Sequence, residues 1–434
     1  MVKPEIIALS IFLISYALIG LEKIPRLYTA VFGALLLIFF RVFTFKEAAG
    51  YIDLQTIGFL FGIFLLIKTL AESGFFNYLA LKVGQRLNYS PLKILVFFPM
   101  LAWFLSSFMD SITVLVFMSA LTYALSKILK FDPVPVIVAE VCLANIGGSG
   151  TLMGDPPNII LGAMFNLGFT KFITHNGPIS FLASLSALLV IYLMNRKKFT
   201  LFNETLKKEE LKKLSPEAAI TDKPLLKIGL WGLGATVFLL VGRDFLHKIL
   251  PMELALTSLL PAFTILTLRG RHPRLKDIIY KIDLETILFF IGLFVIVGSL
   301  EKTGLIQKVG QSLFGLARRP YGLISLIFWG GVSSSAFVDN VPMAMSFGYL
   351  IRSLHALSAF PIRILVWTAS LGLDIGGNLT PIGASANIVA YSFLRKEGVR
   401  LNWYVWFLYS FLPTISALIV CHLLLLLKYK VGFY

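Results

Sequence analysis

The chain has 434 residues, of which 57% are hydrophobic and 14% are charged. A soluble domain carries about 25% charged residues, so this composition excludes a protein whose main solvent is water. The formal net charge is +16, but Lys and Arg sit in short clusters between apolar runs, as cytoplasmic anchors of membrane proteins do. We therefore predict an all-α polytopic membrane protein that lies in a lipid bilayer and binds no nucleic acid.

The first half of the chain, residues 1–195, predicts five spans, one of them broken, and one helical hairpin. Residues 92–129 form two apolar arms around the polar tip Ser-Ser-Phe-Met-Asp-Ser, which is typical of a re-entrant hairpin. The apolar run over 134–167 is interrupted by IGGSGTLMGDPPN, which is the pattern of a discontinuous helix. Continuous spans, each near the roughly 20 residues that cross a bilayer, are predicted at 4–20, 27–43, 54–71 and 176–195.

A hydrophilic segment, residues 196–224, follows the first half, and its basic clusters predict a cytoplasmic linker. The second half, residues 225–434, repeats the order of the first. It has a hairpin over 321–354 and a helix over 362–395 that is broken by IGGNLTPIGASAN. Its continuous spans are predicted at 225–241, 253–269, 284–300 and 404–427.

The two halves align in one register. Asp110 and Asp339 are 229 positions apart, and the same shift superposes Thr151 on Thr380 and Asn158 on Asn387. A register kept through the tip and the break indicates a duplication. Each half has an odd number of crossings, which predicts two inverted repeats.

The two breaks are the first candidate for a binding site. Freed backbone groups are costly in lipid, so a broken helix persists where it faces a polar cavity or an ion. Half-helix N-termini beyond Pro157 and Ser385 would direct partial positive charge at such a cavity. Close helix packing is the structural alternative for the glycines of both breaks.

The intramembrane carboxylates are the sharper signal. Asp110 and Asp339 occupy equivalent tips, and Asp155 and Asp374 flank the breaks. A charged Asp in mid-membrane costs about 2.5–3.5 kcal/mol on insertion scales, so it is expected to face a cavity, to be paired or to be protonated. Such groups suit coupling to a proton or sodium gradient, with sodium bound near Asp110 and Asp339. For Asp374 a role at the end of a helix is the alternative.

Neutral donors and acceptors complete the predicted substrate and ion site. We expect no cofactor, no catalytic residue and no metal site, since the histidines have no ligand spacing. Two other aspartates, Asp53 and Asp283, begin equivalent spans and are predicted to be N-caps. The predicted site residues are Ser106, Ser107, Asp110, Gly148, Thr151, Asp155, Asn158, Ser335, Asp339, Asn340, Gly377, Asn378, Thr380 and Asn387.

The first break lies in the string NIGGSGTLMGDPPNIILG, and the second half contains DNVPMAM followed by LGLDIGGNLTPIGASANIVAY. These strings resemble the ion transporter superfamily, in particular its branch of arsenite efflux permeases and melanosomal P protein, which is related to sodium/proton antiporters and divalent-anion:sodium symporters. The resemblance implies a transporter of the inner (plasma) membrane, a homodimer, and an elevator-like movement of a transport portion against a scaffold. It places the site among the tips near Asp110 and Asn340 and the breaks near Thr151, Asn158, Thr380 and Asn387.

The resemblance leads to a functional hypothesis with several alternatives. The first is secondary transport of a small inorganic solute, arsenite or antimonite, with efflux driven by protons. Sodium/proton antiport and sodium-coupled symport of a carboxylate or another anion are alternatives within transport, although the tips Ser-Phe-Met-Asp and Ala-Phe-Val-Asp-Asn depart from the Ser-Asn-Thr motif of dicarboxylate carriers. From other classes, a passive anion channel remains an alternative. An intramembrane aspartyl protease is not expected, because position 152 is Leu where its motif has Gly.

Overall fold

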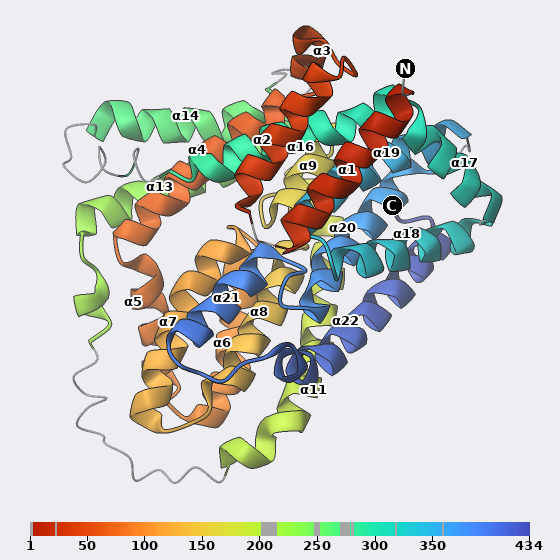
Figure 1. Cartoon of the computed structure of the whole chain (residues 1–434). Helices are drawn as coiled ribbons and strands as arrows, with labels where there is room; N and C mark the ends of the chain where they lie inside the picture. Colours follow the sequence, from red (N-terminus) through yellow and green to blue (C-terminus); the bar gives the residue numbers. More distant parts are fainter. Residues whose placement is uncertain are drawn as a thin grey trace.

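The computed structural model describes residues 3–21, 24–200, 215–246, 252–269, 278, 282–316, 319–357 and 360–434. Within these ranges the regular structure is helical, and the helices pack in two groups (Figure 1). We call the first the α4–α16 group. It consists of α1 (Pro4–Leu21), α2 (Arg26–Phe39), α4 (Leu54–Glu72), α13 (Lys223–Leu246), α14 (Leu254–Arg269) and α16 (Leu284–Lys302).

The second group contains the predicted hairpins and breaks, and we call it the hairpin group. Its members are α6 (Pro91–Ser106), α7 (Ser111–Leu129), α8 (Pro133–Gly148), α9 (Pro156–Met164), α11 (Gly177–Thr200), α18 (Pro320–Ser335), α19 (Asn340–Leu357), α20 (Ile362–Gly376), η2 (Gly377–Leu379), α21 (Ser385–Lys396) and α22 (Trp403–Val431). The shorter elements α3 (Phe45–Gly50), α5 (Phe75–Arg86), α10 (Phe169–His175), η1 (Glu217–Ala219) and α17 (Leu305–Leu316) connect the two groups or lie at their edges.

Both helix breaks are present where the sequence predicts them. The first separates α8 from α9 and the second separates α20 from α21. Pro156 is the first residue of α9. At this position a backbone N–H has no acceptor within the helix, so the missing N–H of proline costs no hydrogen bond. Close packing also requires glycine here, since a Cβ on Gly147 would lie 2.1 Å from the backbone oxygen of Trp103 on the hairpin arm α6.

The packing repeats between the halves as the sequence register does. The pair α6 and α8 corresponds to α18 and α20, and the pair α4 and α14 corresponds to α16 and α2. The halves also exchange contacts, because α7 packs on α21 of the other half and α9 packs on α19. The hairpin of each half therefore meets the broken helix of the other.

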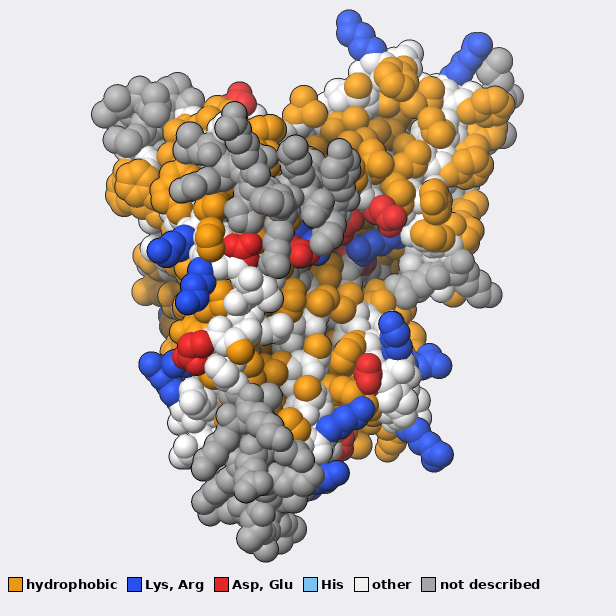
Figure 2. Space-filling view, turned by 90° about the vertical axis from the view of Figure 1, so that its left-hand side faces the viewer, with side chains coloured by type: hydrophobic (Ala, Val, Ile, Leu, Met, Phe, Trp, Pro, Cys, Tyr) orange, Lys and Arg blue, Asp and Glu red, His pale blue; other side chains and the backbone are white. Residues whose placement is uncertain are grey.

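Six described helices are long and apolar enough to cross a membrane: α4, α7, α11, α13, α16 and α22. The predicted spans at 4–20, 27–43 and 253–269 also form apolar helices, but the described part of each is shorter than those six. On the face in Figure 2, hydrophobic side chains cover much of the surface, and acidic and basic side chains lie together across its middle. The chain is thus a multi-pass membrane protein.

One predicted helix end was wrong, and several short helices were not predicted. The helix predicted to run to residue 43 ends at Phe39, because Arg41 takes a φ of 58° and the N–H of Val42 bonds back to the oxygen of Leu37, closing the helix end. The short helices α3, α5, α10 and α17 were not predicted from the sequence, and of these α5 and α17 precede the two hairpins. Within the predicted linker 196–224, residues 201–214 lie outside the described residues.

Candidate functional site

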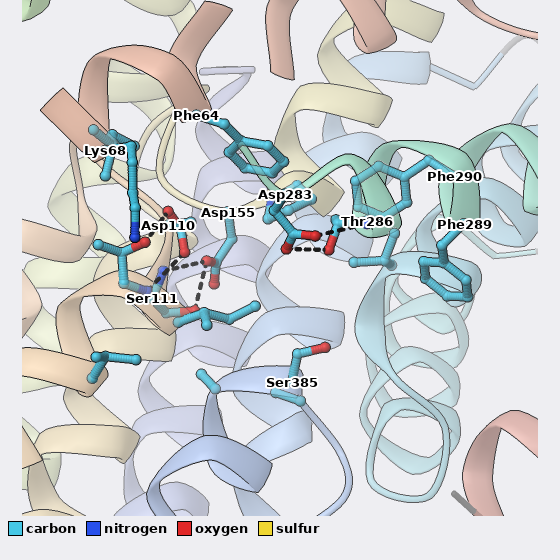
Figure 3. A pocket seen from close by; sticks show the side chains of 18 of the residues that line it. Phe64, Lys68, Asp110, Ser111, Asp155, Asp283, Thr286, Phe289, Phe290 and Ser385 are labelled. Atoms are coloured by element: carbon cyan, nitrogen blue, oxygen red, sulfur yellow. Dashed lines mark hydrogen bonds between the residues drawn. The ribbon is translucent and has the colours of Figure 1, made fainter. Parts of the chain in front are cut away.

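A cavity of about 220 Å³ lies where the two helix groups meet. Its walls come from both halves: α4 and α16 on one side, and the start of α7, the first break and the start of α21 on the other. Figure 3 shows Asp110, Ser111 and Asp155 on one side of this space, with Asp283, Thr286 and the rings of Phe289 and Phe290 across from them. Of the predicted site residues, Asp110, Asp155 and Asn340 line it.

Asp110 and Asp155 face the cavity but are held differently. Asp110 caps α7, since its carboxylate accepts hydrogen bonds from the Thr113 N–H (2.8 Å) and hydroxyl (2.9 Å). Asp155 Oδ1 accepts from the Ser111 N–H (3.1 Å) and hydroxyl (2.8 Å), which ties the first break to the first hairpin. Asp155 Oδ2 is buried and has no partner among the described residues. That oxygen is free to accept a proton or to hold a bound cation.

Asp339, the repeat counterpart of Asp110, makes a different set of contacts. Its Oδ2 lies 3.5 Å from the Arg26 guanidinium and accepts a hydrogen bond from the Ser385 hydroxyl. Arg26 also donates to that hydroxyl. Arg26 is the first residue of α2, whereas Asp339 is in the second hairpin tip and Ser385 begins α21. The contact therefore joins the two helix groups at the cavity wall.

Asn340 and Asp374 form the second buried link between a tip and a break. The Asn340 amide donates to Asp374 Oδ1 at 3.1 Å, while Asp374 Oδ2 is buried without a partner among the described residues. Asp374 lies two residues before the end of α20 and does not line the cavity. Both roles considered for it, at a helix end and in ion binding, fit this placement.

Asn158 and Asn387 bind the backbone of their own breaks. The Asn158 amide donates to the oxygens of Gly148 and Thr151, each at 2.8 Å, and the Asn387 amide donates to Gly377 and Thr380 at the same distances. Both side chains are fully buried and neither lines the cavity. The duplicated asparagines thus satisfy the carbonyls that the breaks release, and their role in solute binding stays a prediction.

The remaining predicted residues lie in the packed shell behind the cavity. The hydroxyls of Ser107, Thr151, Ser335 and Thr380 donate to the backbone oxygens of Gly147, Ser107, Leu373 and Ala336 in that order. Asn378 bonds to Asn145 and to the Cys142 oxygen, and Ser106 is buried with no partner among the described residues. Gly148 and Gly377 leave room for close contacts, since a Cβ on Gly148 would lie 2.3 Å from Asp155 Oδ2.

Several cavity residues were missed from the sequence: Arg26, Lys68, Ser111, Asp283 and Ser385. Asp283 caps α16 as predicted, through the Thr286 N–H at 2.9 Å, and it also lines the cavity. Arg26 is a basic residue between two predicted spans, and the sequence pattern predicts that such residues anchor the protein at the membrane surface. The signal that could have found Ser385 was its predicted position at the start of a half-helix. Within the described chain no three His, Cys, Asp or Glu residues form a metal-binding group.

Two helical hairpins and two broken helices around a charged cavity inside a polytopic membrane protein define a membrane transporter. The comparison with protein families agrees: the chain belongs to the CitMHS citrate transporter family, whose model matches residues 16–372. It is a multi-pass transporter of the plasma membrane and not an enzyme.

The chain is also similar to individual relatives in sequence and to solved structures in fold. The chain is 29% identical to the "46 kDa membrane protein" of Mycobacterium leprae over 98% of its own length and 99% of the relative's. It is 26% identical to the human P protein over 94% of its length, and it spans 58% of that protein. Its fold is similar to Neisseria gonorrhoeae MtrF (TM-score 0.58, 13% identity, 98% and 94% coverage) and to Alcanivorax borkumensis YdaH (0.59, 12%, 99% and 99%).

Proposed function

We propose that this chain is a cation-coupled secondary transporter that carries a small anion, with a carboxylate as the first candidate. The observation that carries the proposal is the cavity, which is lined both by the carboxylates of Asp110, Asp155 and Asp283 and by the cationic side chains of Arg26 and Lys68. Carboxylates serve the coupling cation, and cationic side chains serve an anion.

The size of the cavity favours a solute over a bare ion. A volume of 220 Å³ has room for several water molecules. A proton or a sodium ion alone needs far less space, so symport or exchange of a polyatomic solute fits better than sodium/proton antiport. The family description, citrate transporter, supports a carboxylate as the first substrate to test.

Arsenite or antimonite efflux, expected from the resemblance, gains no support from a family described by citrate. Arsenite is neutral near pH 7 and does not use the two cationic side chains of the cavity. It stays in the substrate panel as the alternative, together with passive anion conduction.

The movement we propose is a displacement of the hairpin group, as the transport portion, against the α4–α16 group, as the scaffold. The cavity supports this division because its two walls come from the two groups. The inverted repeats predicted from the sequence are consistent with this movement, since two inverted units have two equivalent arrangements to exchange.

The test is transport in proteoliposomes with imposed proton and sodium gradients and a panel of citrate, succinate, phosphate and arsenite. We expect uphill accumulation of one of the anions that depends on one of the gradients. Flux that only dissipates a gradient would identify a channel. Proton movement provoked by sodium alone would identify an antiporter, and gradient-dependent flux of arsenite alone would restore the first hypothesis.

A further inference from the structure

Arg26 breaks the symmetry between the two repeats. The α2 helix that it begins corresponds to α14, and the residues at the start of α14, Leu254 and Ala255, are apolar. Asp110 and Asp339 correspond to each other, yet Arg26 contacts only Asp339. Both carboxylates accept a backbone N–H from the start of the helix that follows them, Asp110 from Thr113 and Asp339 from Val341 at 3.1 Å. One tip carboxylate therefore has an internal cation, and its counterpart has none among the ion pairs of the described residues.

The ion pair lies in a position where its charges need partners. The Asp339 side chain is 6% exposed and that of Arg26 is 35% exposed, and the ring of Phe289 lies 5.3 Å from the guanidinium. The Arg26 guanidinium stabilises this buried carboxylate, together with hydrogen bonds from the Ser385 hydroxyl and the Val341 N–H. Arg26 supplies the positive charge next to Asp339, so a coupling cation at Asp339 would compete with Arg26 for this carboxylate.

Displacement of Arg26 has a consequence for the anion. Arg26 lines the cavity, and among the ion pairs of the described residues its carboxylate partner is Asp339, so the end of that contact makes the guanidinium available to an anion in the cavity. A guanidinium binds a carboxylate through two parallel N–H bonds, which makes it a selective partner for a carboxylate substrate. The same side chain is then needed by Asp339 in the empty state and by the substrate in the loaded state.

We propose that Arg26 is a counter-ion shared between Asp339 and the transported anion, so that binding of the coupling cation at Asp339 releases Arg26 to bind the anion. This inference rests on the proposed function and adds the residue that couples cation to anion. The cation raises the affinity for the anion, and by linkage the anion raises the affinity for the cation by the same factor.

The test measures equilibrium binding to the purified full chain in lipid nanodiscs. The anion probes are citrate, succinate, phosphate and arsenite, each in sodium and in choline buffers at pH 5.5 and pH 8. The wild type is expected to bind one probe at least tenfold more tightly when sodium or protons are supplied. Asp339→Asn, which cannot hold Arg26 by charge, is expected to bind that anion tightly whether or not the cation is present.

Arg26→Gln is expected to lose at least tenfold in anion affinity, and Arg26→Lys to recover part of it, since Lys keeps the charge but not the paired geometry. In Arg26→Gln the affinity for the coupling cation is expected to rise, because its competitor is gone. The control is Lys127→Gln, which removes another ion pair between helices, with Glu397 at 4.0 Å, away from the cavity. Its binding is expected to match the wild type.

The outcomes separate the two proposals. A wild type that binds no anion from the panel overturns the proposed function and the shared counter-ion with it. A wild type that binds an anion in a cation-dependent way, with unchanged affinity in Arg26→Gln, overturns only the shared counter-ion. Equal losses in both single variants, restored in Arg26→Gln/Asp339→Asn, would show that the pair merely holds two helices together.

Discussion

Asp110 combines two tasks that one substitution can separate. Its carboxylate caps α7 through the Thr113 N–H and also faces the cavity. Asn caps a helix about as well as Asp, so Asp110→Asn keeps the cap and removes the charge. We expect normal membrane insertion and thermal stability, with gradient-driven uptake in proteoliposomes reduced at least tenfold.

The matched control for Asp110 is Asp132, which caps α8 through the Val134 N–H at 3.0 Å and lies away from the cavity. Asp132→Asn is expected to leave uptake unchanged. Asp110→Ala would lose the cap as well, at a cost of about 0.5–2 kcal/mol. Wild-type coupled uptake by Asp110→Asn would remove this residue from the cation site.

We expect Asn158 to stabilise the fold and not to bind the transported anion directly. Its amide satisfies the carbonyls of Gly148 and Thr151, and Asn158→Ala leaves both buried without a donor. An unsatisfied buried polar group costs about 1–3 kcal/mol. We expect a lower midpoint of thermal unfolding and an unchanged dissociation constant for the anion in the folded fraction. Weaker binding at unchanged stability would support the direct role predicted from the sequence.

At the level of elements, each break depends on a glycine that lets a hairpin arm approach. A Cβ at Gly376 would lie 2.5 Å from the Cα of Val332, as one at Gly147 would meet Trp103. Gly376→Ala must push α18 away from α20 and distort the second break. We expect a lower unfolding temperature and at least a tenfold loss of uptake.

Gly234 provides the control for Gly376. It lies inside α13 with open space where a Cβ would be, so Gly234→Ala avoids any clash. Ala is favoured over Gly in a helix by roughly 0.5–1 kcal/mol, so stability is expected to stay equal or rise. Equal behaviour of the two alanine variants would contradict the packing argument.

The elements differ in how well the sequence predicts them. Long apolar helices and the breaks follow from hydrophobic runs, Gly and Pro, and these signals are local. The helices α5 and α17 were missed because they are short and carry polar faces, although both contain the string Lys-Val-Gly-Gln. The early end of α2 depends on the backbone turn at Arg41, which hydrophobicity does not report.

In the candidate site, too, some residues could be predicted from local sequence signals and others could not. Asp110, Asp155 and Asn340 were predicted from the hairpin tips and the first break and line the cavity, whereas Arg26 and Lys68 belong to α2 and α4 of the other helix group. Their contribution depends on how the two groups pack, and no local pattern encodes that. The duplicated asparagines were predicted as donors and acceptors for a solute; their amides donate to the backbone of the breaks, and a role in binding stays a prediction.

A cross-link between the two helix groups tests the proposed movement. The Tyr16 hydroxyl of α1 donates to the Pro342 oxygen of α19 at 2.9 Å and lies 3.4 Å from the Ser346 hydroxyl. In Tyr16→Cys/Ser346→Cys, a short bifunctional thiol reagent is expected to join the groups and abolish uptake, with recovery on reduction. The native Cys142 and Cys421 are fully buried and are not expected to react.

The single-cysteine variants treated with the same reagent are the controls and are expected to remain active. Full uptake by a quantitatively cross-linked protein would exclude a displacement of α19 against α1. The predicted homodimer is a separate matter, which the mass of the protein in nanodiscs measures.

The exchange of contacts between the repeats also constrains biosynthesis. Asp110 packs at a cavity completed by Ser385, which the ribosome adds 275 positions later. At about 5–20 residues per second that interval lasts roughly 15 to 55 s. During this time the nascent first half holds Asp110 and Asp155 in the bilayer without their eventual surroundings. Within the first half Thr113 and Ser111 already donate hydrogen bonds to these two carboxylates, so we expect the tip and the first break to form before the second half closes the cavity.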